Sequence, residues 1–287
     1  MIPTALYNSY SAALTENDRQ CRAALAAVIS RLDPDDIDGI RDVLMEAYPA
    51  LVRLYGRRAA QVAVEFYSSV RDAAEVNRPF APTLPTAVIT AGVADALRDV
   101  GRIVGGLYSG KSTIESFSSS MQQMASTRAM RMADSTLHAL ANADPAHPKV
   151  ALVPHAGACA WCVLIGSRGF TNSENAMDHM RHDGCKCVTV VDFDRDNPAL
   201  EGYDPFDYMD EYAALRDDVD FEKQLIEEWN SMSEAEKARY VRRTKTSKGE
   251  PKTVPGDWST YRRNRTLQEM NVLLGRTKSS RIGARGR

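Results

Sequence analysis

Cysteine and histidine side chains gather in one short part of this 287-residue sequence. Cys159 and Cys162 form a C-x-x-C pair, and His182, Cys185 and Cys187 follow as H-x-x-C-x-C. Thiolates and imidazoles are the ligands that Zn²⁺ prefers, and two such clusters a short stretch of chain apart are typical of zinc sites. A C-x-x-C turn brings two sulfurs to one ion, and C-x-C on an extended segment points both sulfurs to one face. The spacing therefore predicts a zinc site.

Zinc binds four ligands, whereas this segment offers five. The preferred set is Cys159, Cys162, His182 and Cys185, and a set with both Cys185 and Cys187 would be a four-cysteine site. Which four bind stays open, and the fifth group would then support a ligand from outside the coordination sphere. Two other histidines are less favoured as ligands: His155 and His179.

A structural zinc is favoured over a catalytic one, because four protein ligands leave no open position for an activated water. Two alternatives to a metal stay open: the cysteines could be small buried hydrophobic residues, or they could form two disulfides. A thioredoxin-like redox role is disfavoured, because no βαβ pattern surrounds the C-x-x-C.

Two further motifs could indicate an enzyme. Residues 105–112 match the phosphate-loop pattern G-x4-G-K-[ST], but the sequence does not support the strand that must precede such a loop. Asp178 and His179 could suggest a histidine-based nuclease, yet no acidic side chains are recognisably arranged to hold a catalytic magnesium. We therefore predict that the protein is not an enzyme.

The residues of these motifs have simpler expected roles. Gly105, Gly106 and Gly110 are expected to separate two helices, with Ser112 capping the second. Two histidines near a helix end and a proline loop are expected on the surface: His138 and His147.

The elements that must position the cysteines are mostly helices. Apolar side chains recur at three- and four-residue spacing over residues 5–142, which predicts consecutive helices, and the prolines between Pro79 and Pro85 predict a linker among them. Four sulfur-bearing residues fall on the apolar stripes and are predicted to lie in the core: Cys21, Met121, Met124 and Met132.

Beyond residue 148 the pattern changes. The β-branched run Val188–Val191 predicts the one convincing strand, and a helical period returns from Phe206 to Trp229. Ser233 and Glu236 predict a capping box at the start of another helix. Roughly the last forty residues are expected to be loosely folded or ordered by a partner.

These patterns predict a mainly α protein: a helical domain over residues 1–148, a small α+β zinc-clipped module over 149–200, and a helical segment with a basic, partly flexible tail over 201–287. Hydrophobic content of 44% and charged content of 26% are near globular averages. The sequence shows neither a membrane span nor a signal-peptide pattern, so we expect a soluble protein in a reducing compartment, without membrane contact.

A net charge of −2 conceals a basic C-terminal end. From Lys237 onward the sequence has fifteen Lys or Arg residues and three acids, with aromatic residues among them. Cations release counterions from phosphates and aromatic rings stack on bases, so nucleic-acid contact is one interpretation. A solvated tail or an arm for an acidic protein surface is an equal alternative. The candidate nucleic-acid contacts are Arg242, Arg243, Lys245, Arg262, Arg263 and Arg265.

One part of the chain resembles a known family. The runs ACAWCVLIGSRG (158–169) and HDGCKC (182–187), followed by the apolar VTVVDF, resemble a segment of the Mu protein F-like minor capsid, or head morphogenesis, proteins of tailed bacteriophages. The versions in phages of actinobacteria are the most similar. The layout is also similar, with a helical N-terminal half before this segment and a variable polar C-terminus after it.

The resemblance implies a structural protein present in few copies inside the virion head, and in the host cytoplasm during assembly. Its implied partners are portal, capsid or scaffold proteins, and the basic tail could contact phage DNA. It assigns no chemistry. The alternative functions are a cellular nucleic-acid-binding zinc module and, less favoured, a metal-dependent nuclease or a phosphate-loop nucleotide hydrolase.

Overall fold

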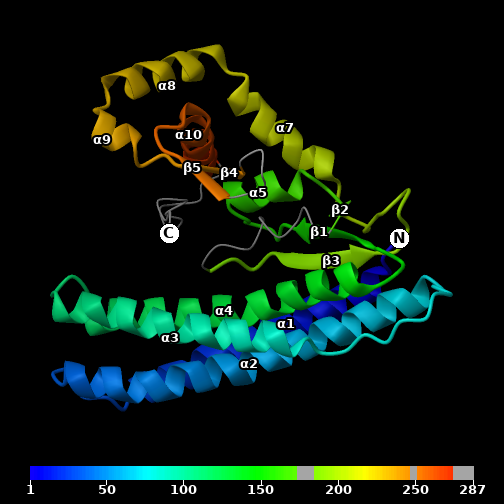
Figure 1. Ribbon diagram of the computed structural model, residues 1–287, viewed down its shortest axis with the longest axis horizontal. Coiled ribbons are helices and arrows are strands. Elements are labelled where there is room, and N and C mark those ends of the chain that lie inside the picture. The colour runs from blue at the N-terminus through cyan, green and yellow to red at the C-terminus, as the bar shows by residue number, and fades with distance from the viewer. Residues whose placement is uncertain (173–183, 246–250, 274–287) are drawn as a thin grey trace. The chain divides into compact units, whose positions relative to one another are not determined.

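The structure is a computed structural model, and it describes residues 1–172, 184–245 and 251–273. The predicted fold class is confirmed, because the described chain is mainly helical and carries a small sheet (Figure 1). The chain forms two compact units, which we describe separately: Met1–His155 with Gly169–Tyr203, and Ala156–Arg168 with Asp204–Arg287. Among the described residues, every helix is too short or too polar to cross a lipid bilayer.

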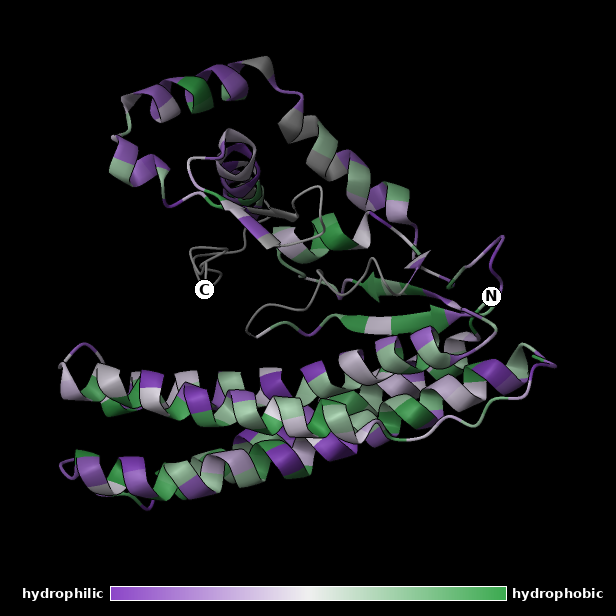
Figure 2. Ribbon diagram, in the orientation of Figure 1, coloured by the Kyte–Doolittle hydropathy of each residue, from purple (hydrophilic) through white to green (hydrophobic). Residues whose placement is uncertain are grey.

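The first unit is built on a bundle of four long helices, α1 (Thr4–Ile29), α2 (Ile37–Ala73), α3 (Thr86–Tyr108) and α4 (Ile114–Ala143). Helix α2 contacts each of the other three, so the four share one hydrophobic core. Hydrophobic positions, green in Figure 2, recur along all four helices as the sequence period requires. The predicted helices and the linker before α3 are confirmed.

The bundle core contains the residues that the apolar stripes predicted. Cys21, Met121, Met124 and Met132 are all buried. Helices α2 and α3 approach Met132 closely, since a Cβ added at Gly56 would lie 2.1 Å from its sulfur, and one at Gly92 would lie 2.2 Å from its methyl carbon. The two glycines therefore admit the methionine between three helices.

A three-stranded antiparallel sheet, with strand order β2-β1-β3, completes the first unit. The strands are β1 (Lys149–Val153), β2 (Thr171–Asn172) and β3 (Val188–Asp192). Strand β3 contacts α4 and α2, and β1 contacts α4. Most residues of β1 and β3 are hydrophobic (Figure 2), and all but Lys149 are buried.

The predicted strand at Val188–Val191 is confirmed as β3, but the expectation that it stands alone is wrong. It pairs along its full length with β1, and Val153 lies opposite Val188. The sequence KVALV of β1 lacks a polar-apolar alternation because nearly all of it is buried. Short apolar runs of this kind cannot be assigned to a strand by periodicity alone.

The described residues of the second unit form five helices and a pair of antiparallel strands: α5 (Ala160–Gly166), α7 (Pro205–Arg216), α8 (Val219–Ser231), α9 (Glu234–Lys237), β4 (Arg242–Lys245), β5 (Pro251–Val254) and α10 (Trp258–Leu273). The helical period predicted from Phe206 to Trp229 is confirmed, and it covers two helices, α7 and α8. Asp218 separates them, because its carboxylate accepts hydrogen bonds from two backbone N–H groups of the first turn of α8. The capping box of Ser233 and Glu236 is confirmed at α9.

An aromatic cluster orders the C-terminal part of the second unit. The rings of Trp229 and Tyr261 have centroids 5.1 Å apart, and those of Tyr240 and Tyr261 are 4.9 Å apart. Trp258 joins the same cluster, and Tyr261 is fully buried. The expectation of a loosely folded end is therefore wrong for residues 251–273. The abundance of cations there obscured an apolar face that includes Leu267 and Met270.

The boundaries predicted at residues 148 and 200 stay predictions. Within the first unit, the chain after β3 returns to the N-terminus, where the Ile2 N–H donates a hydrogen bond to the Ala199 carbonyl at 2.8 Å. The terminal amino group lies 3.4 Å from the Asp192 carboxylate. These contacts anchor the strand that follows the second cysteine cluster.

Candidate metal centre

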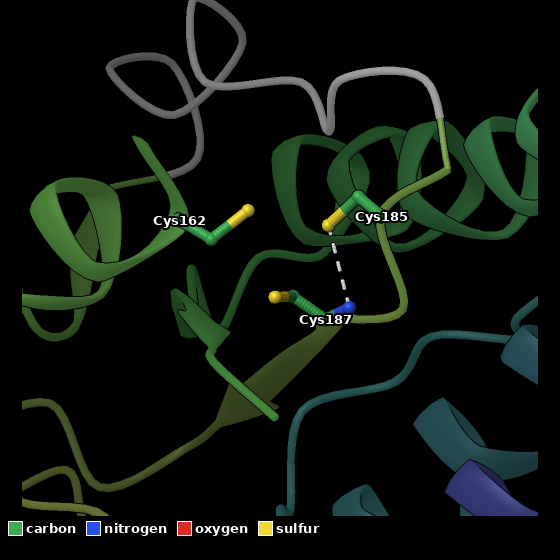
Figure 3. Close-up of side chains that lie close together, drawn as sticks. All are labelled: Cys162, Cys185 and Cys187. Carbon is green, nitrogen blue, oxygen red and sulfur yellow. Dashed lines mark hydrogen bonds between the residues drawn. The ribbon is translucent and has the colours of Figure 1, made fainter. Parts of the chain in front are cut away.

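Cys185 and Cys187 lie in the short segment that enters β3. Both side chains are buried, and Cys187 directly precedes Val188, the first residue of the strand. The backbone N–H of Cys187 donates a hydrogen bond to the sulfur of Cys185 at 3.3 Å, drawn as a dashed line in Figure 3. Such a bond favours a sulfur that carries negative charge, as a metal-bound thiolate does.

Helix α4 holds the residue directly before Cys185. The backbone N–H of Gly184 donates a hydrogen bond to the hydroxyl oxygen of Thr127 at 2.9 Å, and that hydroxyl in turn donates to the Gln123 carbonyl at 2.8 Å. Gly184 has a φ of +79°, and a Cβ there would lie 2.0 Å from the Gln123 amide nitrogen. The left-handed backbone favours a glycine at this position, and the Gln123 side chain would have to move to admit a Cβ.

Cys159 and Cys162 lie at the start of α5. Cys159 is the N-cap residue, and Cys162 lies three residues later in the first turn, a spacing that places two side chains on the same side of a helix. Cys162 is fully buried, whereas Cys159 is only partly buried. The C-x-x-C pair therefore has the geometry of a turn that could present two sulfurs to one ion.

Three of the predicted ligands form one group. The sulfur atoms of Cys162, Cys185 and Cys187 lie within 4.8 Å of one another, and Figure 3 shows the three side chains converging. The structure places none of these three described cysteines in a disulfide. Zinc binds cysteine sulfurs at about 2.3 Å in a tetrahedral array. The group could therefore hold a metal ion.

The donor set fits a soft or borderline metal. The group consists only of thiols, the ligands that Zn²⁺ prefers over the hard cations Mg²⁺ and Ca²⁺. Burying thiolates in apolar surroundings without a cation would be costly, and a bound metal offsets that cost. The identity of the metal and the choice of four ligands stay predictions.

The other two predicted ligands are Cys159 and His182. Cys159 directly precedes α5 and is not in the three-sulfur group. His182, like His179, lies outside the described residues. Sequence reasoning missed Thr127 and Gly184, which hold the second cysteine pair. Gly184, directly before Cys185, was a usable signal, whereas nothing in the local sequence points to Thr127.

The comparisons with known proteins identify the family. A family model described as VG15 protein matches residues 1–215, three quarters of the chain. The chain belongs to the VG15 protein family. The family's name suggests a viral gene product and so a phage protein, and the match does not address the Mu protein F-like resemblance. Neither the curated proteins nor the solved structures gave a match.

The phosphate-loop motif of this VG15 family member does not have phosphate-loop geometry. Gly105 and Gly106 lie inside α3, and Gly110 forms the turn after it with a φ of +63°. The backbone N–H of Lys111 donates to the Gly106 carbonyl at 3.0 Å instead of facing a phosphate site. The expected cap at Ser112 is wrong by one residue, since Thr113 and Ser116 form the capping box of α4.

One of the two histidines expected on the surface of the VG15 bundle is buried. His138 on α4 is 7% exposed, and desolvation by burial lowers its pKa. The expectation failed because His138 follows the core residue Leu137 and falls on the inner face of a helix whose period was already apparent. His147 is exposed, as expected.

Several tail cations already have partners within the second unit of the VG15 chain. Arg242 pairs with Asp257 at 2.9 Å, Arg262 with Glu222 at 3.0 Å and Arg265 with Glu228 at 2.9 Å. The guanidinium of Arg263 lies over the Trp161 ring, 5.8 Å from its centroid. The side chains of Arg243 and Lys245 lie outside the description. DNA contact by these residues stays a prediction.

Proposed function

We propose that the chain is a structural minor capsid protein of a tailed phage, of the Mu protein F-like head morphogenesis type, in which zinc clips the cysteine segments together. One observation carries the proposal. Cys162, Cys185 and Cys187, all from the motif that resembles that family, form a buried group of three thiols. Membership of the VG15 family supports a phage origin.

The proposed ligands are these three cysteines and a fourth from Cys159 or His182. Zinc bound there would crosslink the segment of the C-x-x-C pair to the segment of Cys185 and Cys187 and so stabilise the fold. Cys187 and Cys185 would enter the site from the end of a buried sheet, where the Gly184 and Thr127 contact fixes their approach. The ligands would fill the coordination sphere, so we propose a structural metal and no enzymatic activity.

The proposed partners are portal, capsid or scaffold proteins in the head interior, met first in the host cytoplasm during assembly. Large apolar side chains on two bundle helices support protein contact, because they are exposed to solvent: Val43, Met45 and Leu54 on α2, and Leu97 and Tyr108 on α3. Apolar groups on an outer helix face contribute to association when a partner covers them.

The test is the composition of purified phage particles. Quantitative mass spectrometry should find the chain in heads from which tails have been removed, at a few copies per portal ring. The portal protein serves as the internal standard, and a non-structural phage protein serves as the negative control. A chain that is expressed during infection yet missing from the heads would contradict the proposal.

A cellular nucleic-acid-binding zinc module is the alternative, and it receives less support. The tail aromatics Tyr240, Trp258 and Tyr261 pack on Trp229 instead of presenting open faces for bases. A nucleotide hydrolase would require activity that a Lys111→Ala variant loses. If the parent chain showed no nucleotide hydrolysis, that alternative would be excluded.

A further inference from the structure

The helix that carries the C-x-x-C pair is capped by a residue far away in the sequence. Helix α5 begins after Cys159, and that residue makes no side-chain capping bond. The first N–H groups of a helix have no partner within the helix, and a buried N–H without one is costly. The N–H of Ala160 donates instead to the side-chain oxygen of Asn271 at 2.9 Å, across 111 residues of chain.

Asn271 lies near the C-terminal end of α10 and is 7% exposed. Leu267, four residues earlier on the same face, and Met270 are buried as well, and α10 contacts both α5 and α7. Earlier on the same helix, Arg263 lies over the ring of Trp161. Helix α10 thus holds both residues that separate the two cysteines, Ala160 through its backbone and Trp161 through its ring.

We propose that Asn271 is a positioning residue for the metal site. It caps α5 in place of Cys159, so the helix does not depend on that cysteine for its first turn, and the C-x-x-C geometry is set before a metal arrives. The inference rests on the metal site of the proposed function. The inference also gives a role to α10. This helix lies outside residues 1–215, the part of the chain that the family model matches.

The expected effect falls on metal affinity. A residue that orients a ligand without touching the metal typically contributes about 10- to 100-fold to affinity. Replacing Asn271 by Leu keeps a similar size and removes the acceptor, so zinc should transfer to a competing chelator about 10-fold more readily. Asn271→Asp keeps an oxygen in the same place, and a carboxylate is favourable at a helix N-terminus. It should therefore restore parent-like affinity.

The experiment uses the full chain loaded with zinc, and it measures zinc affinity by competition with a colorimetric chelator. Val272→Ala is the matched control, because Val272 is adjacent on α10 and its side chain is exposed to solvent. Substitution of Co²⁺ for Zn²⁺ gives a second readout, since the absorption bands of cobalt report the ligand geometry. Asn271→Ser, whose shorter side chain leaves the Ala160 N–H out of reach, replaces Asn271→Leu where the latter does not fold.

The inference predicts weakened zinc binding and altered cobalt bands in Asn271→Leu, with Asn271→Asp and Val272→Ala close to the parent. Unchanged zinc affinity and cobalt bands in Asn271→Leu, even with a lower melting temperature, would overturn the positioning role and leave the metal site intact. A parent chain that binds no zinc would instead overturn the proposed function, and the positioning role with it.

Discussion

Burial alone does not determine what a cysteine does in this chain. Cys21 is fully buried in the bundle, where desolvation raises the pKa of its thiol to about 12, so it remains a neutral hydrophobic group. Cys162, Cys185 and Cys187 are also buried but lie beside one another. The sequence patterns of the two cases differ, because Cys21 falls on a helical stripe and the others fall in C-x-x-C and C-x-C patterns.

Gly184 provides a residue-level test of how the second cysteine pair is held. We expect Gly184→Ala to lower the free energy of unfolding by about 1–3 kcal/mol, because its φ is +79° and a Cβ would lie 2.0 Å from Gln123. Zinc affinity should fall as well, since Cys185 would shift. The measurements are urea unfolding and chelator competition.

Gly110→Ala is the control for that substitution. Its φ of +63° imposes similar backbone strain, but no heavy atom lies within 4 Å of the added Cβ. Gly110→Ala should therefore lower stability without changing zinc affinity. Equal zinc affinities in the two variants would contradict the role assigned to the Gly184 contact.

Glu228 gives the second unit a pH dependence. Hydrogen bonds from Arg265 and Tyr261 lower its pKa to about 2. In the unfolded chain a glutamate has a pKa of about 4.3, so the stabilisation is fully present above that pH and is lost as the pH falls toward 2. Because the Glu228 side chain is about a third exposed and solvent screens the pair, Glu228→Gln should cost only about 1 kcal/mol at about pH 7 and progressively less below about pH 4. A pH-independent difference in unfolding free energy between parent and variant would contradict this assignment.

At the scale of elements, periodicity predicted what local sequence determines. The four bundle helices and β3 follow from stripes and β-branching. Strand β1 could not be predicted from periodicity, because it is too short and too buried to alternate. The break between α7 and α8 could not be predicted either, because Asp218 makes it through local hydrogen bonds to the start of α8.

The metal site also has parts that local sequence predicts and parts that it does not. Spacing predicted the cysteines, but the residues that hold their segments could not be predicted. Thr127 contacts Gly184 across 57 residues, and Asn271 contacts Ala160 across 111. Neither Thr127 nor Asn271 belongs to a motif, and only the packing of α4 and α10 brings them to their partners.

Two glycines test helix packing in the bundle. Gly101 is exposed on α3 and has open space around its added Cβ, so Gly101→Ala should raise the free energy of unfolding by up to about 1 kcal/mol. Gly56→Ala on α2 should instead lower it, because the Cβ would meet the Met132 sulfur at 2.1 Å. Thermal unfolding by circular dichroism measures both, and a destabilised Gly101→Ala would contradict the open face of α3.

At the scale of the whole molecule, charge is segregated along the chain and partly neutralised within the second unit. Acidic residues of α8 pair with arginines of α10, as Glu222 does with Arg262 and Glu228 with Arg265. The net charge of −2 therefore does not describe the C-terminal end, where residues 274–287 carry five cations and no acid.

This distribution predicts which cations would govern DNA binding. Neutralising Lys278, Arg281 and Arg285 together by glutamine should reduce the log–log slope of DNA affinity against salt by about 3, because each phosphate that a cation neutralises adds about 0.9. Arg262→Gln, which removes a cation already paired with Glu222, should change the slope by less than about 1. Fluorescence anisotropy with labelled duplex DNA measures both. A slope that the triple substitution leaves unchanged would contradict tail-mediated DNA binding.

We propose that the buried thiols hold a structural zinc, and metal analysis of the purified full chain tests this proposal. Elemental mass spectrometry should find about one zinc per chain, retained in Cys21→Ser and absent from a Cys162→Ser, Cys187→Ser double variant. The double variant should also unfold at a lower urea concentration than the parent. A parent chain that is folded yet metal-free, or a double variant that keeps its zinc, would contradict a structural zinc site.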